Sequence, residues 1–127
     1  MKLALDTNAY RAFMEGEKKA VDLVRHAVVI GIPVPVLAEL RFGFLAGTKG
    51  RQNESSLLKF LDSSRVEILS CDQQTSYFYA QIKLQLKKQG TPIPINDVWI
   101  AALVTQHSMT LYTYDRDFDY LPQLSRA

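Results

Sequence analysis

At 127 residues the chain has the length of one ordinary domain, and we expect residues 1–127 to form a single folded unit. Its hydrophobic share of 47% and charged share of 22% indicate a globular protein and exclude a disordered chain, whereas a net charge of +2 does not by itself identify a nucleic-acid-binding protein. A single cysteine, which has no partner for an intrachain disulfide, and the absence of a signal-peptide pattern after Met1 predict a cytoplasmic protein.

The hydrophobic pattern alternates between short strand-like segments and longer helical ones. In chain order it predicts a strand over residues 2–5, helices over 8–14 and 18–27, a strand over 28–32, a helix that begins near Pro35, a helix over 53–63, a strand over 66–69, a helix over 72–89, a helix over 96–104 and a strand over 110–114. The longest apolar run, 28–38, contains two prolines and is too short to span a bilayer, so no membrane association is expected. Strands that alternate with helices indicate an α/β fold with a parallel sheet covered by helices on both faces.

Several helix ends can be assigned from single residues. Asp72 is a good N-cap for the long helix, and Gly90 fits the position just after its last turn. Asn96 is expected to cap the following helix. Cys71 stands beside an apolar run and is predicted to be a buried structural thiol.

Four acidic residues stand at points of this pattern where their side chains could meet. Asp6 follows the first predicted strand and Asp115 follows the last. In an open parallel sheet, ligands bind beyond the carboxyl ends of the strands. Glu39 interrupts an apolar run about one turn into its helix, and Asp97 opens the helix after a proline-rich loop. We therefore expect the four carboxylates to converge at one edge of the sheet.

Each acid also has an ordinary interpretation when it is taken alone. Asp6 and Asp115 could be turn or cap residues. Glu39 could be a solvated helix residue, and Asp97 could only complement the dipole at a helix N-terminus. The joint pattern is much more specific than any one of the four.

A cluster of carboxylates needs something to offset its repulsion. Two charges about 5 Å apart repel by about 3 kcal/mol at an effective dielectric near 20, and several such pairs raise pKa values and oppose folding. A divalent cation removes this repulsion, and oxygen ligands without His or Cys partners favour Mg²⁺ or Mn²⁺ over Zn²⁺. Such a site suits the hydrolysis of phosphodiester bonds.

Four stretches around these acids form a recognisable set of motifs. They are Leu-Asp-Thr-Asn at 5–8, Ala-Glu-Leu-Arg-Phe-Gly at 38–43, Asn-Asp-Val-Trp-Ile-Ala-Ala at 96–102, and Leu-Tyr-Thr-Tyr-Asp-Arg-Asp-Phe at 111–118. In this order, over almost the whole chain, they resemble the PIN-domain ribonucleases, and most of all the VapC-type toxins of bacterial toxin–antitoxin pairs. The resemblance implies a PIN-like three-layer α/β/α sandwich with a central parallel sheet of four to five strands, and a metal-dependent endoribonuclease activity. The run 33–36 departs from the family, which often has Ser or Thr there, and this should alter the helix cap and not the chemistry.

The resemblance also assigns roles to individual positions. Its catalytic, metal-binding acids match Asp6, Glu39, Asp97 and Asp115. Thr7 and Asn8 match residues that help to orient the first acid, and Thr113 matches a small hydroxyl residue beside the site. Asp117 matches a less regular acid, which either is a further metal ligand or holds Arg116.

Partners follow from the same resemblance: an RNA substrate such as a tRNA, a cognate antitoxin protein, and a second copy of the chain in a homodimer. The basic side chains expected to bind RNA phosphates near the mouth of the site are Arg41, Lys49, Arg51 and Arg116. Apolar surface around Phe42, Phe44 and Leu45, and around Tyr10 and Phe13 of the early helix, is expected to receive the antitoxin. Antitoxins of this kind commonly insert a basic side chain among the acids, which offsets the same repulsion that a metal offsets.

Two alternatives remain open. The first is another Mg²⁺-dependent phosphoryl-transfer domain, either a haloacid-dehalogenase-like phosphatase or a response-regulator receiver. The phosphatase pattern requires a second Asp where Asn8 stands, and the receiver requires an acidic pair at the first strand and a Lys after the last, which the chain lacks. The second alternative is a catalytically silent PIN-like binding module, and the presence of all four acids argues against it.

Overall fold

The computed structural model describes all 127 residues as four strands, six α-helices and a short 3-10 helix. In chain order the elements are β1 (Lys2–Leu5), α1 (Thr7–Met14), α2 (Lys18–His26), β2 (Val29–Pro33), α3 (Val34–Ala46), α4 (Gly50–Leu61), β3 (Val66–Leu69), α5 (Gln73–Gln89), α6 (Ile95–Gln106), β4 (Thr110–Tyr112) and the 3-10 helix Arg116–Tyr120. Every predicted strand and helix is present and of the predicted type, and the 3-10 helix is an addition. None of the helices has both the length and the apolar character that crossing a membrane requires.

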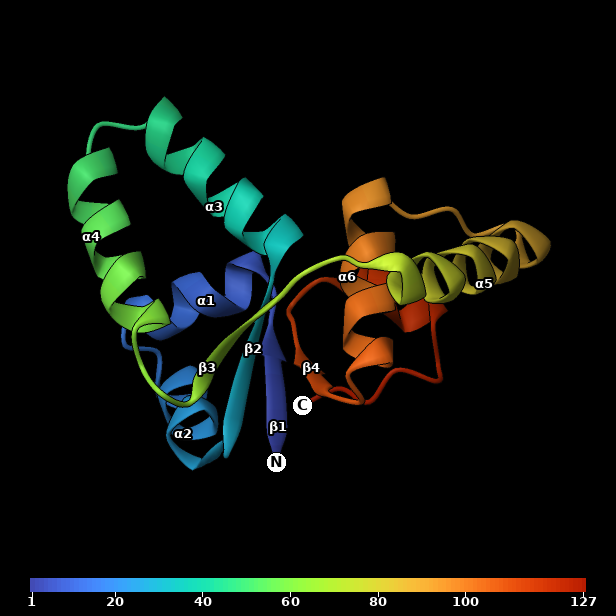
Figure 1. Cartoon of the computed structure of the whole chain (residues 1–127), viewed down its shortest axis with the longest axis horizontal. Coiled ribbons are helices and arrows are strands. Elements are labelled where there is room, and N and C mark those ends of the chain that lie inside the picture. Colours follow the sequence, from blue (N-terminus) through green and yellow to red (C-terminus); the bar gives the residue numbers. More distant parts are fainter.

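The four strands form one parallel sheet in the order β3-β2-β1-β4 (Figure 1). Leu3 of β1 pairs with Ile30 of β2 on one side and with Thr110 of β4 on the other. Because the strands run in one direction, their carboxyl ends share one edge of the sheet. The chain leaves this edge at Asp6 after β1 and approaches Asp115 after β4.

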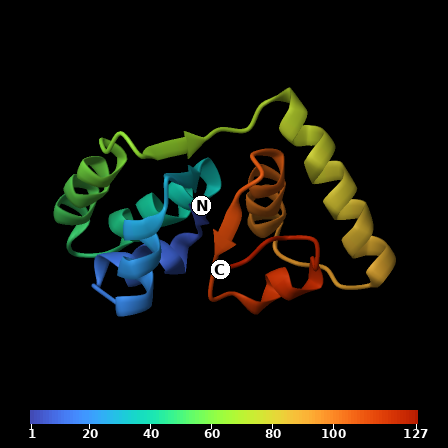
Figure 2. The same cartoon turned by 90° about the horizontal axis from the view of Figure 1, so that it is seen from below.

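Helices cover both faces of the sheet. Helices α1 to α4 gather on one side, while α5 and α6 pack against each other on the opposite side (Figures 1 and 2). The central strands are therefore buried on both faces, and Leu3, Leu5, Ile30 and Ile32 are at most 1% exposed. The predicted three-layer α/β/α sandwich is confirmed, with four strands in its sheet.

The ends of α5 follow the predicted chemistry. The Asp72 carboxylate accepts a hydrogen bond from the Thr75 backbone N–H at 3.1 Å, and the Thr75 hydroxyl oxygen accepts one from the Asp72 N–H at 2.9 Å. Gly90 ends the helix with φ +70°, a left-handed conformation that glycine adopts without the strain of a side chain.

Several element boundaries differ from the predictions by one to three residues, and three of these differences have a clear physical reason. Helix α4 begins at Gly50 and not near Asn53, because its first turn is polar and exposed and so leaves no apolar period to detect. Strand β4 ends at Tyr112, and the Asp115 N–H beyond it bonds to the Thr113 hydroxyl instead of to a neighbouring strand. Helix α6 begins at Ile95 with Pro94 as its N-cap, so Asn96 lies inside the helix and does not cap it.

The predicted burial of Cys71 is wrong, because this thiol is exposed. Leu69 ends β3 as a buried residue, but the chain leaves the sheet immediately afterwards. Cys71 therefore lies in the exposed connection that leads into α5.

Candidate active site

Asp6 occupies the turn between β1 and α1. Its Oδ1 caps α1 by accepting a hydrogen bond from the Ala9 backbone N–H at 2.9 Å. Its Oδ2 accepts a hydrogen bond from the Thr113 hydroxyl, which comes from the segment after β4. Burial raises the pKa of the Asp6 carboxyl, and the nearby Asp115 and Glu39 charges add to the effect of burial, whereas the two hydrogen bonds lower the pKa.

Glu39 projects from α3 and is held by two other helices. Thr7, at the start of α1, donates its hydroxyl hydrogen to Glu39 Oε2 at 2.7 Å. Asn96, in the first turn of α6, donates from Nδ2 to Glu39 Oε1 at 3.1 Å. Because both carboxylate oxygens accept a hydrogen bond, the Glu39 side chain is fixed in one orientation where α1, α3 and α6 meet.

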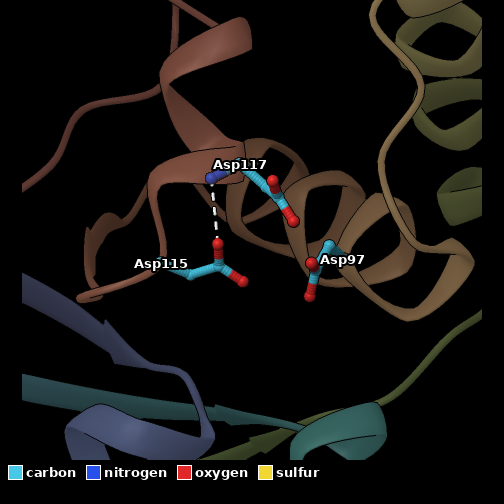
Figure 3. A group of neighbouring side chains, drawn as sticks. All are labelled: Asp97, Asp115 and Asp117. Atoms are coloured by element: carbon cyan, nitrogen blue, oxygen red, sulfur yellow. Dashed lines mark hydrogen bonds between the residues drawn. The ribbon is translucent and has the colours of Figure 1, made fainter.

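The segment after β4 is organised by one hydroxyl group and one carboxylate. The Thr113 hydroxyl, which donates to Asp6, also accepts a hydrogen bond from the Asp115 backbone N–H at 2.9 Å. Asp115 in turn accepts at Oδ1 from the Asp117 backbone N–H at 2.9 Å and so caps the 3-10 helix (Figure 3). The hydrogen bonds of Thr113 therefore set the distance between Asp6 and Asp115.

Three carboxylates crowd together beside this loop. Asp97 from α6 faces Asp115 and Asp117 from the opposite segment, and one oxygen of each lies within 4.8 Å of the others (Figure 3). Burial raises the pKa of Asp97 to about 7, and the negative charges of Asp115, Glu39, Asp117 and Asp6 contribute to the shift. The carboxyl group of Asp97 therefore keeps its proton to a higher pH than an ordinary aspartate does when no cation is present.

A single pocket of about 290 Å³ is lined by the four acids that the sequence predicts to converge. Its lining residues come from α1, α3, α6 and the two strand ends: Asp6, Thr7, Asn8, Arg11, Glu39, Phe42, Asp97, Ile100 and Asp115. The structure thus brings Asp6, Glu39, Asp97 and Asp115 to one edge of the sheet, with Thr7 and Asn8 beside them. Asp117 stands next to this pocket through its proximity to Asp97 and Asp115.

The donor set of the pocket fits a hard divalent cation. Its candidate ligand atoms are carboxylate oxygens, and no His or Cys side chain lines it. The three oxygens within 4.8 Å are nearly as close as ligands around one Mg²⁺, which lie roughly 3–4 Å apart. A cation at this place would also offset the neighbouring negative charges that, in addition to burial, raise the pKa of Asp97.

The basic residues predicted to bind RNA lie elsewhere. Arg41 makes three hydrogen bonds to Glu54, at 3.0, 3.3 and 2.9 Å. It lines a separate pocket of about 990 Å³ between α3 and α4, together with Lys49 and Arg51. The Arg116 side chain is 94% exposed and lies 3.7 Å from Asp119. Since no one of these four cations lines the acid pocket, their RNA-binding role stays a prediction.

The sequence alone did not assign a role in the site to two of its polar residues, Arg11 and Asn96. Arg11 lines the acid pocket, and its spacing of one helical turn from Thr7 could have indicated this, because residues i and i+4 share a helix face. Asn96 holds Glu39, although its position before Asp97 suggested only a cap. Its actual partner comes from a different helix, so no local pattern identifies that contact.

Comparison with known proteins gives consistent matches over nearly the full length of the chain. The PIN domain family matches residues 3–124. Ribonuclease VapC2 of Rickettsia felis is 31% identical over 125 residues, which cover 94% of this chain and 92% of that protein. The structure of VapBC2 from Rickettsia felis, bound to a DNA fragment from its promoter, has a TM-score of 0.85 at 30% identity and covers 100% of this chain and 98% of that one. VapBC-5 from Mycobacterium tuberculosis, a member of the VapBC family of toxin–antitoxin systems, has a TM-score of 0.75 at 28% identity and covers 99% of this chain and 95% of that one.

Proposed function

Because this chain belongs to the PIN domain family, we propose that it is a metal-dependent endoribonuclease and the toxin of a toxin–antitoxin pair. The observation that carries the proposed activity is the convergence of Asp6, Glu39, Asp97 and Asp115 on one pocket. The name of the related Ribonuclease VapC2 supports RNA as the substrate class. A tRNA is the first substrate to test.

The acids of the pocket would hold Mg²⁺ or Mn²⁺. Asp97, Asp115 and Asp117 offer the closest set of oxygens. Asp6 and Glu39 line the same pocket as Asp97 and Asp115. A cation bound there supplies activation of the attacking water and neutralises the charge that develops on the phosphate. Asp117 is the ligand whose assignment rests on proximity alone, since it does not line the pocket itself.

The remaining polar groups of the site position these acids. Thr113 holds the Asp6 carboxylate and the Asp115 backbone, and Thr7 and Asn96 hold both oxygens of Glu39. Such hydrogen bonds fix the acids before substrate arrives, so little reorganisation is needed during the reaction. The pocket has room for a phosphate group and a water molecule, so most of the RNA strand must lie outside it.

The proposed partners are a cognate antitoxin protein and a second copy of the chain. Phe42 and Leu45 of α3 are 74% and 87% exposed, and Phe42 lines the acid pocket. The expectation that Tyr10 exposes apolar surface is wrong, because Tyr10 is buried in the core, and Phe13 and Phe44 are partly buried against it. Large exposed apolar side chains such as Phe42 and Leu45 favour a protein contact, and the related structures are VapBC complexes. A basic side chain of an antitoxin that entered the acid pocket would offset the same repulsion that a cation offsets.

The test is cleavage of a purified tRNA in the presence of Mg²⁺ or Mn²⁺, with and without EDTA. We expect Asp6→Asn and Asp97→Asn to reduce the cleavage rate by at least about a hundredfold, because each removes a charged ligand oxygen. Asp22→Asn is the matched control, since Asp22 is exposed on α2 and far from the pocket. Equal cleavage by all variants would identify a contaminating nuclease, and hydrolysis of small phosphomonoesters instead of RNA would favour a phosphatase.

A further inference from the structure

Arg11 is the one basic side chain that lines the acid pocket. It also lines the adjoining pocket of about 430 Å³ between α1, α3 and α4, so its side chain lies at the boundary of the two. Arg11 forms no ion pair and no side-chain hydrogen bond, although four carboxylates share its pocket. Its guanidinium therefore retains its donors for a ligand.

The backbone of α3 is shaped to receive this guanidinium. A Cβ added at Gly43 would lie 3.1 Å from Arg11 Nη2, so the absence of a side chain at Gly43 leaves room for the arginine over α3. Arg11 also lies in the last turn of α1, where a cation complements the helix dipole. The helix dipole would be complemented by any positive charge near that helix end. It does not explain why the Arg11 guanidinium lies against α3 at the mouth of the acid pocket.

Charge balance explains why a positively charged side chain is needed at the mouth of the acid pocket. Asp6, Glu39, Asp97 and Asp115 face the pocket, and one divalent cation offsets only part of their charge. An RNA strand brings further negative charge to the same mouth. Arg41 is paired with Glu54, and Arg116 lies near Asp119, so neither offers a free cation to the incoming strand at the pocket.

We infer that Arg11 binds a backbone phosphate of the RNA strand at the mouth of the acid pocket, between the four acids and the neighbouring α1–α3–α4 pocket. This inference rests on the proposed ribonuclease function and names the group that holds its substrate. Arginine suits the task because its planar fork of N–H donors matches phosphate oxygens.

The test measures binding of a fluorescently labelled single-stranded RNA of mixed sequence across a series of NaCl concentrations in EDTA, where no cleavage interferes. We expect Arg11→Gln to weaken binding by roughly tenfold at low salt. The slope of log affinity against log salt should fall by about 0.7, the value for one lost phosphate contact on a single strand. Arg25→Gln is the matched control, because Arg25 is exposed on α2, which does not line the acid pocket. It should change neither the RNA affinity nor the salt slope.

A second variant displaces the arginine without removing it. Gly43→Ala places a methyl group against Arg11 Nη2, so RNA affinity should fall to a value between those of the wild type and Arg11→Gln. The melting temperature should not fall, because alanine is the better helix former. An unchanged affinity of Gly43→Ala would contradict the position of Arg11 over α3.

Failure of the inference can be told apart from failure of the proposed function. If the wild-type protein cleaves RNA but Arg11→Gln shows the wild-type salt slope, the ribonuclease proposal stands and the role of Arg11 is refuted. If the wild-type protein binds RNA with the Arg11-dependent slope but never cleaves it, the inference stands and the ribonuclease proposal is refuted. Weaker binding to an antitoxin with unchanged RNA binding would assign Arg11 to the protein partner and overturn the inference, as would a wild-type protein that binds no RNA at low salt.

Discussion

Asp97 has the most perturbed carboxyl group of the site. Its burial and four neighbouring acids raise its pKa to about 7, from an ordinary value of 3.8. Below about pH 4 the group is protonated in both the folded and the unfolded chain, and it has no net effect on stability. Between about pH 4 and pH 7 the folded protein keeps a proton that the unfolded chain has lost, so each rise in pH lowers the free energy of unfolding.

The first prediction follows from this difference. In EDTA, the melting temperature of the wild-type protein should fall as the pH rises from about 5 to about 8, and Asp97→Asn should remove most of this fall while raising the melting temperature at the higher pH. Thermal denaturation followed by circular dichroism over this pH range measures both effects. Asp22→Asn should follow the wild-type curve, since Asp22 is exposed. A melting temperature of Asp97→Asn that tracks the wild type at every pH would contradict the raised pKa of Asp97.

Single residues differ in how far the sequence could assign them. Asp6 and Asp115 were predictable because the end of a parallel strand is a place where ligands bind, whatever the rest of the chain does. Asn96 was assigned to a cap because Asn is a common N-cap residue. Its actual partner, Glu39, is 57 residues away on another helix, so the local sequence did not indicate this contact. Arg41 was predicted to lie near the mouth of the site, but Glu54 of α4 holds it in a different pocket.

At the scale of elements, the segment after β4 connects the two ends of the site. The Thr113 hydroxyl both donates to the buried Asp6 and accepts from the Asp115 N–H. Replacement of a buried hydrogen-bonding group leaves its partners without compensation, which costs about 1–3 kcal/mol. Thr113 therefore links the turn after β1 to the loop that carries Asp115.

The second prediction concerns this link. Thr113→Val should lower the free energy of unfolding by about 1–2 kcal/mol and reduce RNA cleavage by about tenfold or more, because Asp6 and Asp115 lose their common contact. Thr110→Val, at the start of β4, is the matched control, since the Thr110 hydroxyl bonds only to the exposed Ser125. Urea denaturation and cleavage rates measure the two effects. Equal losses in the two variants would show that Thr113 acts only through the general stability of β4.

The elements themselves were predictable where an apolar period is strong. Strands β1 and β2 are continuous apolar runs because helices cover both of their faces. The first turn of α4 was missed because it is polar, and the end of β4 was misplaced because Thr113 and Tyr114 are β-formers whose backbone turns away from the sheet. Boundaries of this kind lie in segments without an apolar period, so a hydrophobic pattern does not locate them.

At the scale of the whole molecule, the acids join the two helical layers of the sandwich. Glu39 belongs to α3, on the side of the sheet that carries α1 to α4, whereas Asp97 belongs to α6 on the opposite side (Figure 1). Asp6 and Asp115 follow strands of the sheet between them. Repulsion within the pocket therefore pushes the layers apart, and a bound cation would hold them together.

The third prediction is that divalent cations stabilise the whole fold. At neutral pH, Mg²⁺ or Mn²⁺ at a concentration about a hundredfold above its dissociation constant should contribute about 2.7 kcal/mol and raise the melting temperature by roughly 10 °C. The increase should shrink near pH 5, because the proton held by Asp97 competes with the cation. Asp97→Asn should show a smaller increase, and NaCl at matched ionic strength should show almost none. An equal shift from NaCl would mean that general screening, and not a cation bound between the layers, relieves the repulsion.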